Sequence, residues 1–349
     1  VKAGDIQSTA VTVTWTPGIQ ADAIVCTPSA ANSSAKTVTY TLTATDISSG
    51  SATVTGLEPE TSYRATLKLG EKTRGYSTFT TNLDLRDAIQ LTPTDDWVTA
   101  IQDAAAGSKF ALAAGEYTLT SAKLQINNNV TIAAQNSGNL PVINTCIHIN
   151  NGSSLYLYQV VMDGTGTDGS QAIEYKTAGG FGDLIISGSE IRNYVKGLIY
   201  INVAAVANTI KIENSIIHDI ECSGGDFIDS RSGGWNNLII SSSTFYSCSA
   251  KRDILRADDA SSKVSASMIT SIDKCTFYNV GNGNANYRFF YLRFPGNTNT
   301  FTNNVVANFD NTRGFANSTS VGVPSYSNNY YYNCKNLTSQ AEGLSLIHI

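Results

Sequence analysis

The chain writes one short phrase five times between residues 182 and 309: GDLIISGSEIRN (182–193), NTIKIENSIIHDI (208–220), NNLIISSSTFYSC (236–248), SMITSIDKCTFYNV (267–280) and NTNTFTNNVVANF (297–309). A second run with alternating apolar residues follows each copy: GLIYINV (197–203), DFIDSRS (226–232), DILRADD (253–259), FFYLRFP (289–295) and RGFANST (313–319). No helical pattern with a period of ~3.6 residues separates the copies. The repeated unit is therefore made of strands.

A phrase that returns every ~20–35 residues is typical of a solenoid, in which each unit buries its apolar side against its neighbours. Four earlier strand-like runs extend the pattern: NNVTIAAQ (128–135), LPVINTCIHINN (140–151), SSLYLYQVVMDG (153–164) and QAIEYKT (171–177). Together the runs give roughly eight coils. We therefore predict an all-β protein with a parallel β-helix over residues 108–344.

Composition excludes several classes of protein. The chain has 349 residues, 15% of them charged, and a formal net charge of −5, which argues against a nucleic-acid partner. It holds no run of about 18 apolar residues, so no transmembrane segment is expected. Its six cysteines form no CxxC pair, which favours buried thiols over a zinc or redox motif and leaves one or two disulfides open.

Residues 1–82 read as a separate small domain. Short alternating runs such as VTVTWTP and KTVTYTLTAT, separated by turn residues, predict an antiparallel β-sandwich. The early Trp15, the corner GLEPETSY (56–63) and the closing FTT (79–81) resemble a fibronectin type III domain. In such a corner the hydroxyl of Tyr63 is expected to hydrogen-bond back to the chain just before it. The resemblance implies a spacer or docking module rather than an activity.

Residues 83–107 form a linker with the one helix that the sequence pattern predicts. Asp95 and Asp96 can cap its start, Trp97 and Ile101 share a face, and Gly107 is expected to end it. A helix here would cover the open end of the first coil. The phrase from Trp97 through AIQDAAAGSKFALAAGEYTL resembles the opening of pectate-lyase-like proteins. That resemblance implies a right-handed parallel β-helix.

The outward positions of the coils carry the functional prediction. We align the coils on the second-strand apolar residues Ile191, Ile217, Phe245, Phe277 and Val306. The alignment places five polar residues in one column, namely Asn202, Arg231, Arg256, Arg293 and Asn317. Residues such as Ile199, Ile228 and Phe290 then point inward, whereas Tyr200, Asp229 and Tyr291 point to solvent. Arg252, Arg288 and Lys251 lie on the same side.

Three arginines stacked ~5 Å apart repel one another, and a bound polyanion would relieve that repulsion. Arginines can hold uronate carboxylates bidentately, while tyrosines stack on sugar rings. The predicted substrate-binding residues are Arg231, Arg252, Arg288, Tyr200, Tyr291, Asn202 and Asn317. The alternative is a surface charge lattice in which the arginines pair with Asp229, Asp253, Asp258 and Asp259.

The resemblance also implies a chemistry. Pectate-lyase-like enzymes cleave uronate polymers by β-elimination, with Arg or Lys as base and often calcium on the substrate carboxylate. Here the candidate catalytic residues are Arg256, Arg293 and Lys251, and the candidate calcium ligands are Asp229, Asp253 and Asp258. The sequence leaves open whether the protein is such a lyase, a non-catalytic glycan-binding protein using the same arginines, or an adhesive solenoid.

The order of a fibronectin-like module and an Asn-rich β-helix resembles secreted or surface proteins of bacterial polysaccharide-utilisation systems. That resemblance implies an acidic polysaccharide or oligosaccharide as partner, a monomer, and a location outside the cell. Residues 345–349 have no place in the repeat, and we expect them to be a non-native tail.

Overall fold

The computed structural model describes residues 1–29, 34–316 and 322–337. The chain divides into two compact units, one formed by residues 1–88 with 136–139 and the other by 89–135 with the residues from 140 onward. Among the described residues, no helix is long and apolar enough to cross a membrane. The predicted tail at 345–349 lies outside the described residues.

The first unit consists of two antiparallel sheets. One pairs β1 (Ala10–Thr14) with β4 (Ser51–Thr55). The other has the order β3 (Val38–Thr41), β2 (Ala23–Pro28), β5 (Ser62–Leu69) and β6 (Lys72–Thr80). The buried Tyr63 accepts a hydrogen bond from the main-chain nitrogen of Glu58 at 3.0 Å, as the corner motif predicts. The assignment of this unit to the fibronectin type III family remains a prediction.

Two short helical elements in this unit were not predicted. The 3-10 turn η1 spans Ala3–Asp5, and α1 spans Ala44–Ser49. In α1 the Thr43 side chain accepts from the Asp46 nitrogen while Asp46 accepts from the Thr43 nitrogen, a reciprocal cap that stabilises the first turn. Gly50 then closes the helix in the left-handed conformation, with φ of 68°. The predicted strand run KTVTYTLTAT (36–45) therefore ends earlier than its alternation indicates, since its last two residues belong to α1.

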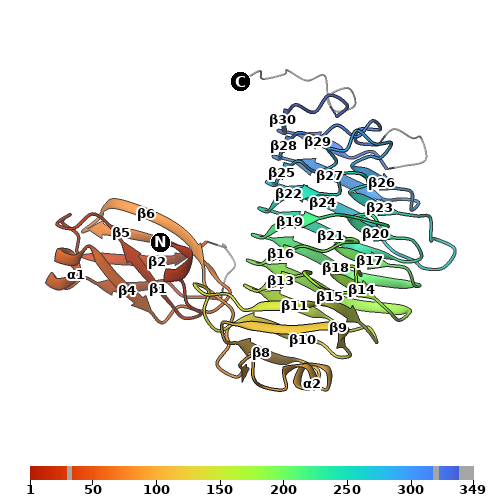
Figure 1. The fold of residues 1–349 in the computed structure, drawn as a ribbon. Helices are drawn as coiled ribbons and strands as arrows, with labels where there is room; N and C mark the ends of the chain where they lie inside the picture. The colour runs from red at the N-terminus through yellow and green to blue at the C-terminus, as the bar shows by residue number, and fades with distance from the viewer. Residues whose placement is uncertain (30–33, 317–321, 338–349) are drawn as a thin grey trace. The chain divides into compact units, whose positions relative to one another are not determined.

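The predicted helix at the start of the second unit is α2 (Trp97–Gln102). Asp96 caps it by accepting from the Thr99 nitrogen, and Trp97 and Ile101 are buried. It ends at Gln102 rather than near Gly107, so the expected end is wrong by one turn. In Figure 1 it lies beside β8 at the N-terminal end of the solenoid.

The second unit is a parallel β-solenoid with three faces (Figure 1). The first face is a ten-stranded sheet made of β7 (Ile89–Leu91), β8 (Ser108–Leu112), β10 (Val130–Ala134), β12 (Leu155–Tyr158), β15 (Gly179–Ser187), β18 (Ala205–Glu213), β21 (Gly234–Ser241), β24 (Ile269–Asp273), β27 (Thr298–Thr302) and β29 (Ser325–Ser327). The second face comprises β13 (Val161–Asp163), β16 (Glu190–Arg192), β19 (Ile216–Ile220), β22 (Thr244–Cys248), β25 (Thr276–Tyr278), β28 (Val305–Ala307) and β30 (Tyr330–Tyr332).

The third face comprises β14 (Ile173–Tyr175), β17 (Ile199–Ile201), β20 (Ile228–Ser230), β23 (Leu255–Ala257) and β26 (Phe290–Leu292). It runs along the right side of the solenoid in Figure 1. The longer strands β9 (Glu116–Ile126) and β11 (Val142–Ile149) pair with each other, and β11 pairs with both β13 and β14. The second and third faces therefore diverge from one strand.

Apolar columns fill the interior of the solenoid. Phe277 is 2% exposed and packs on Phe245 with ring centroids 4.9 Å apart, and on Phe289 at 5.1 Å. The inward second-strand residues are buried as predicted, namely Ile191, Ile217, Phe245, Phe277 and Val306. The same alternation predicts that Ile269 points inward, but Ile269 is 45% exposed. Thr270 pairs with Leu238 and takes the buried position instead.

Polar ladders hold the corner between the first and second faces. The Ser189 nitrogen donates to the Ser215 hydroxyl, and the Ser215 nitrogen donates in turn to the Ser243 hydroxyl. Asn304 continues this ladder by accepting from the Cys275 nitrogen at 2.8 Å. The residue before each rung has a positive φ, for example 50° at Asn214, which turns the chain from one face to the next.

Candidate functional site

The third face carries the polar residues singled out in the sequence, but in a different register. Paired strands place Tyr200, Asp229, Arg256 and Tyr291 in one column. Asp229 is only 1% exposed and its carboxylate accepts from Arg231, so the expectation that it points to solvent is wrong. The inward positions on either side, such as Ile228 and Phe290, are buried as predicted. The expectation that Arg256 shares a column with Arg231 and Arg293 is therefore wrong.

Asp258 stands where Arg256 was expected. The main-chain nitrogens of Arg231, Asp258 and Arg293 each donate to the main-chain carbonyl of a buried residue one coil earlier. These carbonyls belong to Ile201, Ser230 and Ala257, respectively. These equivalent contacts align Arg231, Asp258 and Arg293 in a second column, two residues after the first. The error arose because the loops before these strands differ in length, so the apolar alternation alone cannot distinguish registers two residues apart.

Arginines and carboxylates therefore alternate within the columns, so that arginines do not stack directly on one another. Arg231 holds Asp229 with its Nε at 3.0 Å and its Nη2 at 2.9 Å. Asp258 accepts from Arg256 Nε at 3.0 Å and from Arg293 Nη2 at 2.6 Å. This pairing is the charge-lattice alternative, and it removes most of the repulsion on which the sequence argument relied.

Asp226 is a member of the site that the sequence reasoning missed. Its side chain is fully buried, and its Oδ2 accepts from Arg231 Nη2 at 3.4 Å and from Arg256 Nη1 at 3.3 Å. Its Oδ1 accepts from the Asp253 nitrogen at 3.1 Å. Asp253 Oδ1 in turn accepts from the Arg288 nitrogen at 2.8 Å. The aspartate that opens both DFIDSRS and DILRADD was the sequence signal for this carboxylate ladder.

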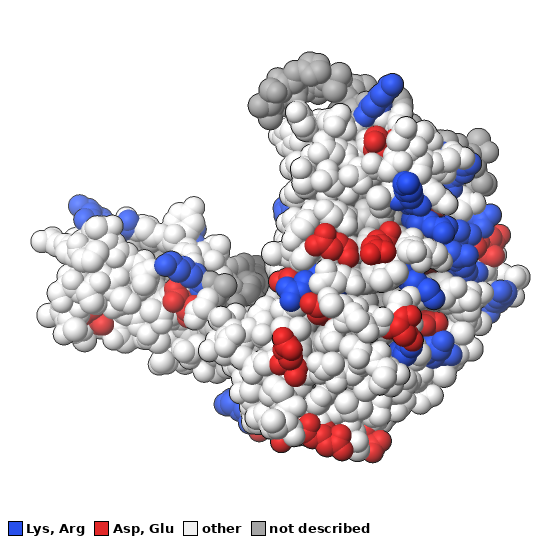
Figure 2. Space-filling model, viewed as in Figure 1, with Lys and Arg blue, Asp and Glu red and all other residues white. Residues whose placement is uncertain are grey.

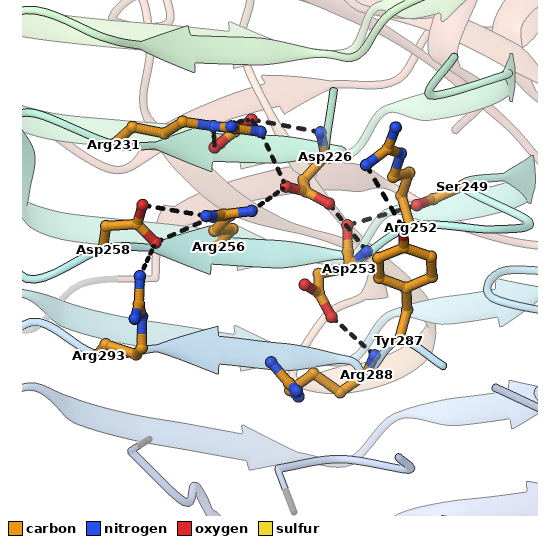
Figure 3. A network of polar contacts seen from close by, with 11 residues as sticks. Asp226, Arg231, Ser249, Arg252, Asp253, Arg256, Asp258, Tyr287, Arg288 and Arg293 are labelled. Carbon is orange, nitrogen blue, oxygen red and sulfur yellow. Dashed lines mark hydrogen bonds and ion pairs between the residues drawn. The ribbon is translucent and has the colours of Figure 1, made fainter. Parts of the chain in front are cut away.

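We call the whole set the arginine network. It combines the five arginines Arg231, Arg252, Arg256, Arg288 and Arg293 with the four carboxylates Asp226, Asp229, Asp253 and Asp258. Figure 3 shows how these residues gather from neighbouring coils. Figure 2 shows Lys and Arg side chains concentrated on the part of the solenoid where β23 and β26 run. A chain with a net charge of −5 thus presents a local surplus of cationic side chains.

Burial shifts the protonation of the network. Desolvation, followed by the neighbouring Asp229 charge, raises the pKa of Asp226. Desolvation also raises the pKa of Asp253 to about 6. Burial alone would lower the pKa of Arg256, but the hydrogen bond and charge of Asp258, with the charge of Asp226, raise it above its ordinary value. Arg256 is therefore held firmly in its charged form.

Tyr291 lies among three guanidinium groups. The Cζ atom of Arg288 is 4.0 Å from its ring centroid, that of Arg293 is 4.8 Å away, and that of Arg256 is 5.3 Å away. These are distances at which cations interact favourably with the ring face. Arg252 has a partner of its own, since its Nη1 donates to the Tyr287 hydroxyl at 3.5 Å.

The remaining candidates lie at the rim of the network or outside it. Lys251 is exposed, and Tyr200 is half-buried in the first column. Asn202 is exposed and precedes Arg231 in the second column, as predicted. Asp259 is exposed and accepts from Ser261. Asn317 lies outside the described residues.

The predicted calcium ligands do not fit a metal centre. The oxygens of Asp229 face Arg231, and those of Asp258 face Arg256 and Arg293. Asp253 points to the Arg288 nitrogen. In the part of the chain that the structure describes, no group of three or more His, Cys, Asp or Glu side chains could hold a metal ion. Calcium binding thus stays a prediction that these contacts do not support.

The fold defines a protein built around a parallel β-solenoid. A family model described as a domain of unknown function (DUF4957) matches residues 115–248. The solved structure of a Yersinia enterocolitica family 28 exopolygalacturonase is similar, with 12% identity, a TM-score of 0.44, and coverage of 94% of this chain and 83% of that one. A likeness at this level says nothing about activity or substrate. No curated protein sequence matches the chain.

Proposed function

We propose that the arginine network binds an acidic polysaccharide. The observation that carries this proposal is the arginine network itself, in which five arginines lie with four carboxylates and Arg231 and Arg293 reach solvent. The remaining positive charge suits carboxylate or sulfate groups, which arginine binds bidentately.

The surface of the network also suits a sugar polymer. The side chains of Arg231 and Arg293 are 33% and 35% exposed, so they reach solvent despite their ion pairs. The outward Tyr200 and Tyr291 add aromatic rings to the same column. Coils spaced ~4.8 Å apart repeat these groups along the solenoid axis, as a polymer repeats its acidic groups.

The ion pairs of Arg256 with Asp258 and Asp226 favour a role of this arginine in binding over a role in cleavage. A base for β-elimination must be able to lose its own proton, whereas Asp258 and Asp226 raise the pKa of Arg256. Arg256 is thereby assigned to binding. Lys251, which is exposed at the rim, and Arg293 remain the candidate bases if the protein is a lyase.

The further parts of the proposal concern the whole protein. Acidic polysaccharides of this kind occur outside cells, so the proposal includes secretion or display on the cell surface. It also includes a fibronectin type III identity for the first unit and a right-handed helix of the pectate-lyase type for the second. The antiparallel sheets with the Tyr63 corner, and the three-faced parallel solenoid, support these assignments.

Affinity electrophoresis tests binding. Native gels containing polygalacturonate, alginate or chondroitin sulfate should retard the wild-type protein at low salt, and Arg293→Gln should reduce that retardation. Normal migration of the wild type in every gel would exclude acidic-glycan binding. Absorbance of unsaturated uronate products, followed with and without calcium, tests cleavage separately. A signal that Lys251→Gln abolishes would establish the lyase alternative.

A further inference from the structure

Arg288 interrupts a ladder of buried carboxylates. The Phe227 nitrogen donates to the Asp253 carbonyl, and the Ile254 nitrogen donates in the same way to the Arg288 carbonyl. Asp226, Asp253 and Arg288 therefore occupy equivalent positions in three successive coils. The first two are carboxylates that each accept a main-chain N–H from the next coil. At the third position the sign of the charge reverses.

The guanidinium of Arg288 is buried without an ion pair among the described residues. Arg288 is 3% exposed, and its Nε has no hydrogen-bond partner. Its main-chain nitrogen, not its side chain, makes the contact to Asp253. In Figure 3 the side chain extends away from that contact, to the side where Arg256 and Arg293 lie. Asp253 acts on Arg288 through its charge, but no carboxylate accepts a hydrogen bond from the buried guanidinium in the described part of the chain, an arrangement that is disfavoured.

Arg293 converges on the same place. Both guanidinium groups lie within 5 Å of the Tyr291 ring centroid, at 4.0 Å for Arg288 and 4.8 Å for Arg293. The Nε of Arg293 is also buried and lacks a partner in the described part of the chain. Among the described residues, the one ion pair of Arg293 is to Asp258, which also pairs with Arg256. The C-terminal side of the network therefore has more guanidinium donors than carboxylates to receive them.

We infer that Arg288, Tyr291 and Arg293 form a subsite for one oxyanionic group of the glycan, a carboxylate or a sulfate ester. Tyr291 holds the two guanidinium groups by contact with its ring, and the anion binds against the exposed part of the Arg293 side chain while Arg288 adds positive charge beside it. The side chain of Arg293 is 35% exposed, so the anion enters from its side. This inference rests on the proposed function, because it assigns where a single acidic group of the polymer binds.

The test uses small anions instead of a polymer. Isothermal titration calorimetry with galacturonate and with galactose 6-sulfate, at constant ionic strength, measures binding to the wild type and to Arg293→Gln. We expect at least one of the two monosaccharides to bind and Arg293→Gln to weaken it at least tenfold. Galactose, which is neutral, should not bind. The two acidic monosaccharides distinguish a carboxylate subsite from a sulfate subsite.

Four further variants distinguish loss of the subsite from loss of folding. Tyr291→Phe keeps the ring and should bind within about twofold of wild type, whereas Tyr291→Leu should lose most of the affinity. Arg74→Gln, at an exposed position of the first unit, removes the same charge and should change nothing. Arg288→Gln should abolish binding, provided that its circular dichroism and melting temperature show a folded protein.

The outcomes separate this inference from the proposed function. If neither acidic monosaccharide binds, or if Arg293→Gln binds them as well as the wild type, the subsite is wrong. Acidic polymers could in that case still retard the protein through Arg231 and Arg252. If monosaccharides bind as expected but no acidic polymer retards the protein, the subsite stands and the polysaccharide function fails.

Discussion

Asp226 is the residue on which the network depends most. It is fully buried, contacts Arg231 and Arg256, and accepts the Asp253 N–H. Removing one partner of a buried ionic group leaves the other partners unsatisfied. We expect Asp226→Ala to lower the free energy of unfolding by about 2–4 kcal/mol in urea denaturation.

Asp259 provides the matched control for that variant. It lies in the same coil as Asp258 but is exposed, and it contacts only Ser261 among the described residues. Asp259→Ala should change the free energy of unfolding by no more than about 0.5 kcal/mol. Equal losses in the two variants would show that the buried position of Asp226 is not what matters.

The buried carboxyl group of Asp253 should make the stability of the protein depend on pH. Desolvation raises its pKa in the folded protein to about 6, above the ordinary value of 3.8. Between these values the folded state binds more protons than the unfolded chain, so stability falls as pH rises through this range. The stabilising contribution of Asp253 is fully present below about pH 4 and is lost above pH 6. The free energy of unfolding should change by roughly 1–3 kcal/mol across this range.

Asp253→Asn cannot ionise and should lack that contribution. Urea denaturation at pH 4.5 and pH 7.5 should show the variant gaining stability relative to wild type at the higher pH. The charges of Asp226, Arg288 and Arg256 act on Asp253, and because Asp226 also titrates, the difference between the two proteins reports Asp253 together with its effect on Asp226. A difference that is the same at both pH values would contradict the prediction.

At the residue scale the sequence predicts whether a side chain points inward or outward better than it predicts which residues of neighbouring coils lie side by side. The apolar alternation correctly predicts that Ile228 and Phe290 point inward, because apolar side chains must fill the interior. It could not place Arg256, since a shift of two residues preserves the alternation. The pairing of Arg231 with Asp229 was foreseen only as an alternative, because it depends on that register.

Among the elements, β25 carries a central part of the aromatic core. Phe277 packs against Phe245, Phe289 and Phe301 from neighbouring coils. Its removal would leave a cavity that rigid neighbouring coils cannot close. Phe277→Ala should therefore cost about 3–5 kcal/mol of unfolding free energy, measured by urea denaturation.

The next residue on the same strand is the control. Tyr278 is 48% exposed and points out of the second face. Tyr278→Ala should cost less than about 1 kcal/mol. If both variants lose the same stability, the strand itself rather than the buried ring is the sensitive feature.

At the element scale the repeats predicted most of the solenoid strands, because the phrase recurs with its apolar positions intact. The failures lie where local hydrogen bonds compete with the pattern. The cap between Thr43 and Asp46 starts a helix inside the last residues of the run KTVTYTLTAT, which the alternation predicts as strand. At β24 the pairing of Thr270 with Leu238 turns Ile269 outward despite its apolar side chain.

For the whole molecule, the geometry predicts indifference to calcium. The carboxylates Asp229 and Asp258 face arginines, and structural metals contribute to stability only where ligands converge on them. Addition of EGTA or of calcium should change the melting temperature by less than about 1 °C. A clear rise with calcium would show that carboxylates of this protein form a site that these contacts do not reveal.

The global architecture could be read from the repeats, whereas the network could not. Its parts come from coils whose connecting loops differ in length, and the buried Asp226 and Arg288 meet their partners only once those coils are stacked. The net charge of −5 gives no hint of a basic face, because charge distribution depends on which columns turn outward.

The most direct test of glycan binding compares two charge-matched double variants in native gels containing acidic polysaccharide. Arg252→Gln/Arg293→Gln removes two network arginines, and Arg64→Gln/Arg74→Gln removes two exposed arginines from the first unit. We predict that the wild type and the second variant are retarded alike at low salt, and that the first variant is not. Retardation should weaken as salt screens the charges, with a Debye length of about 8 Å at 0.15 M. Equal retardation of both variants would contradict the assignment of the arginine network as the binding face.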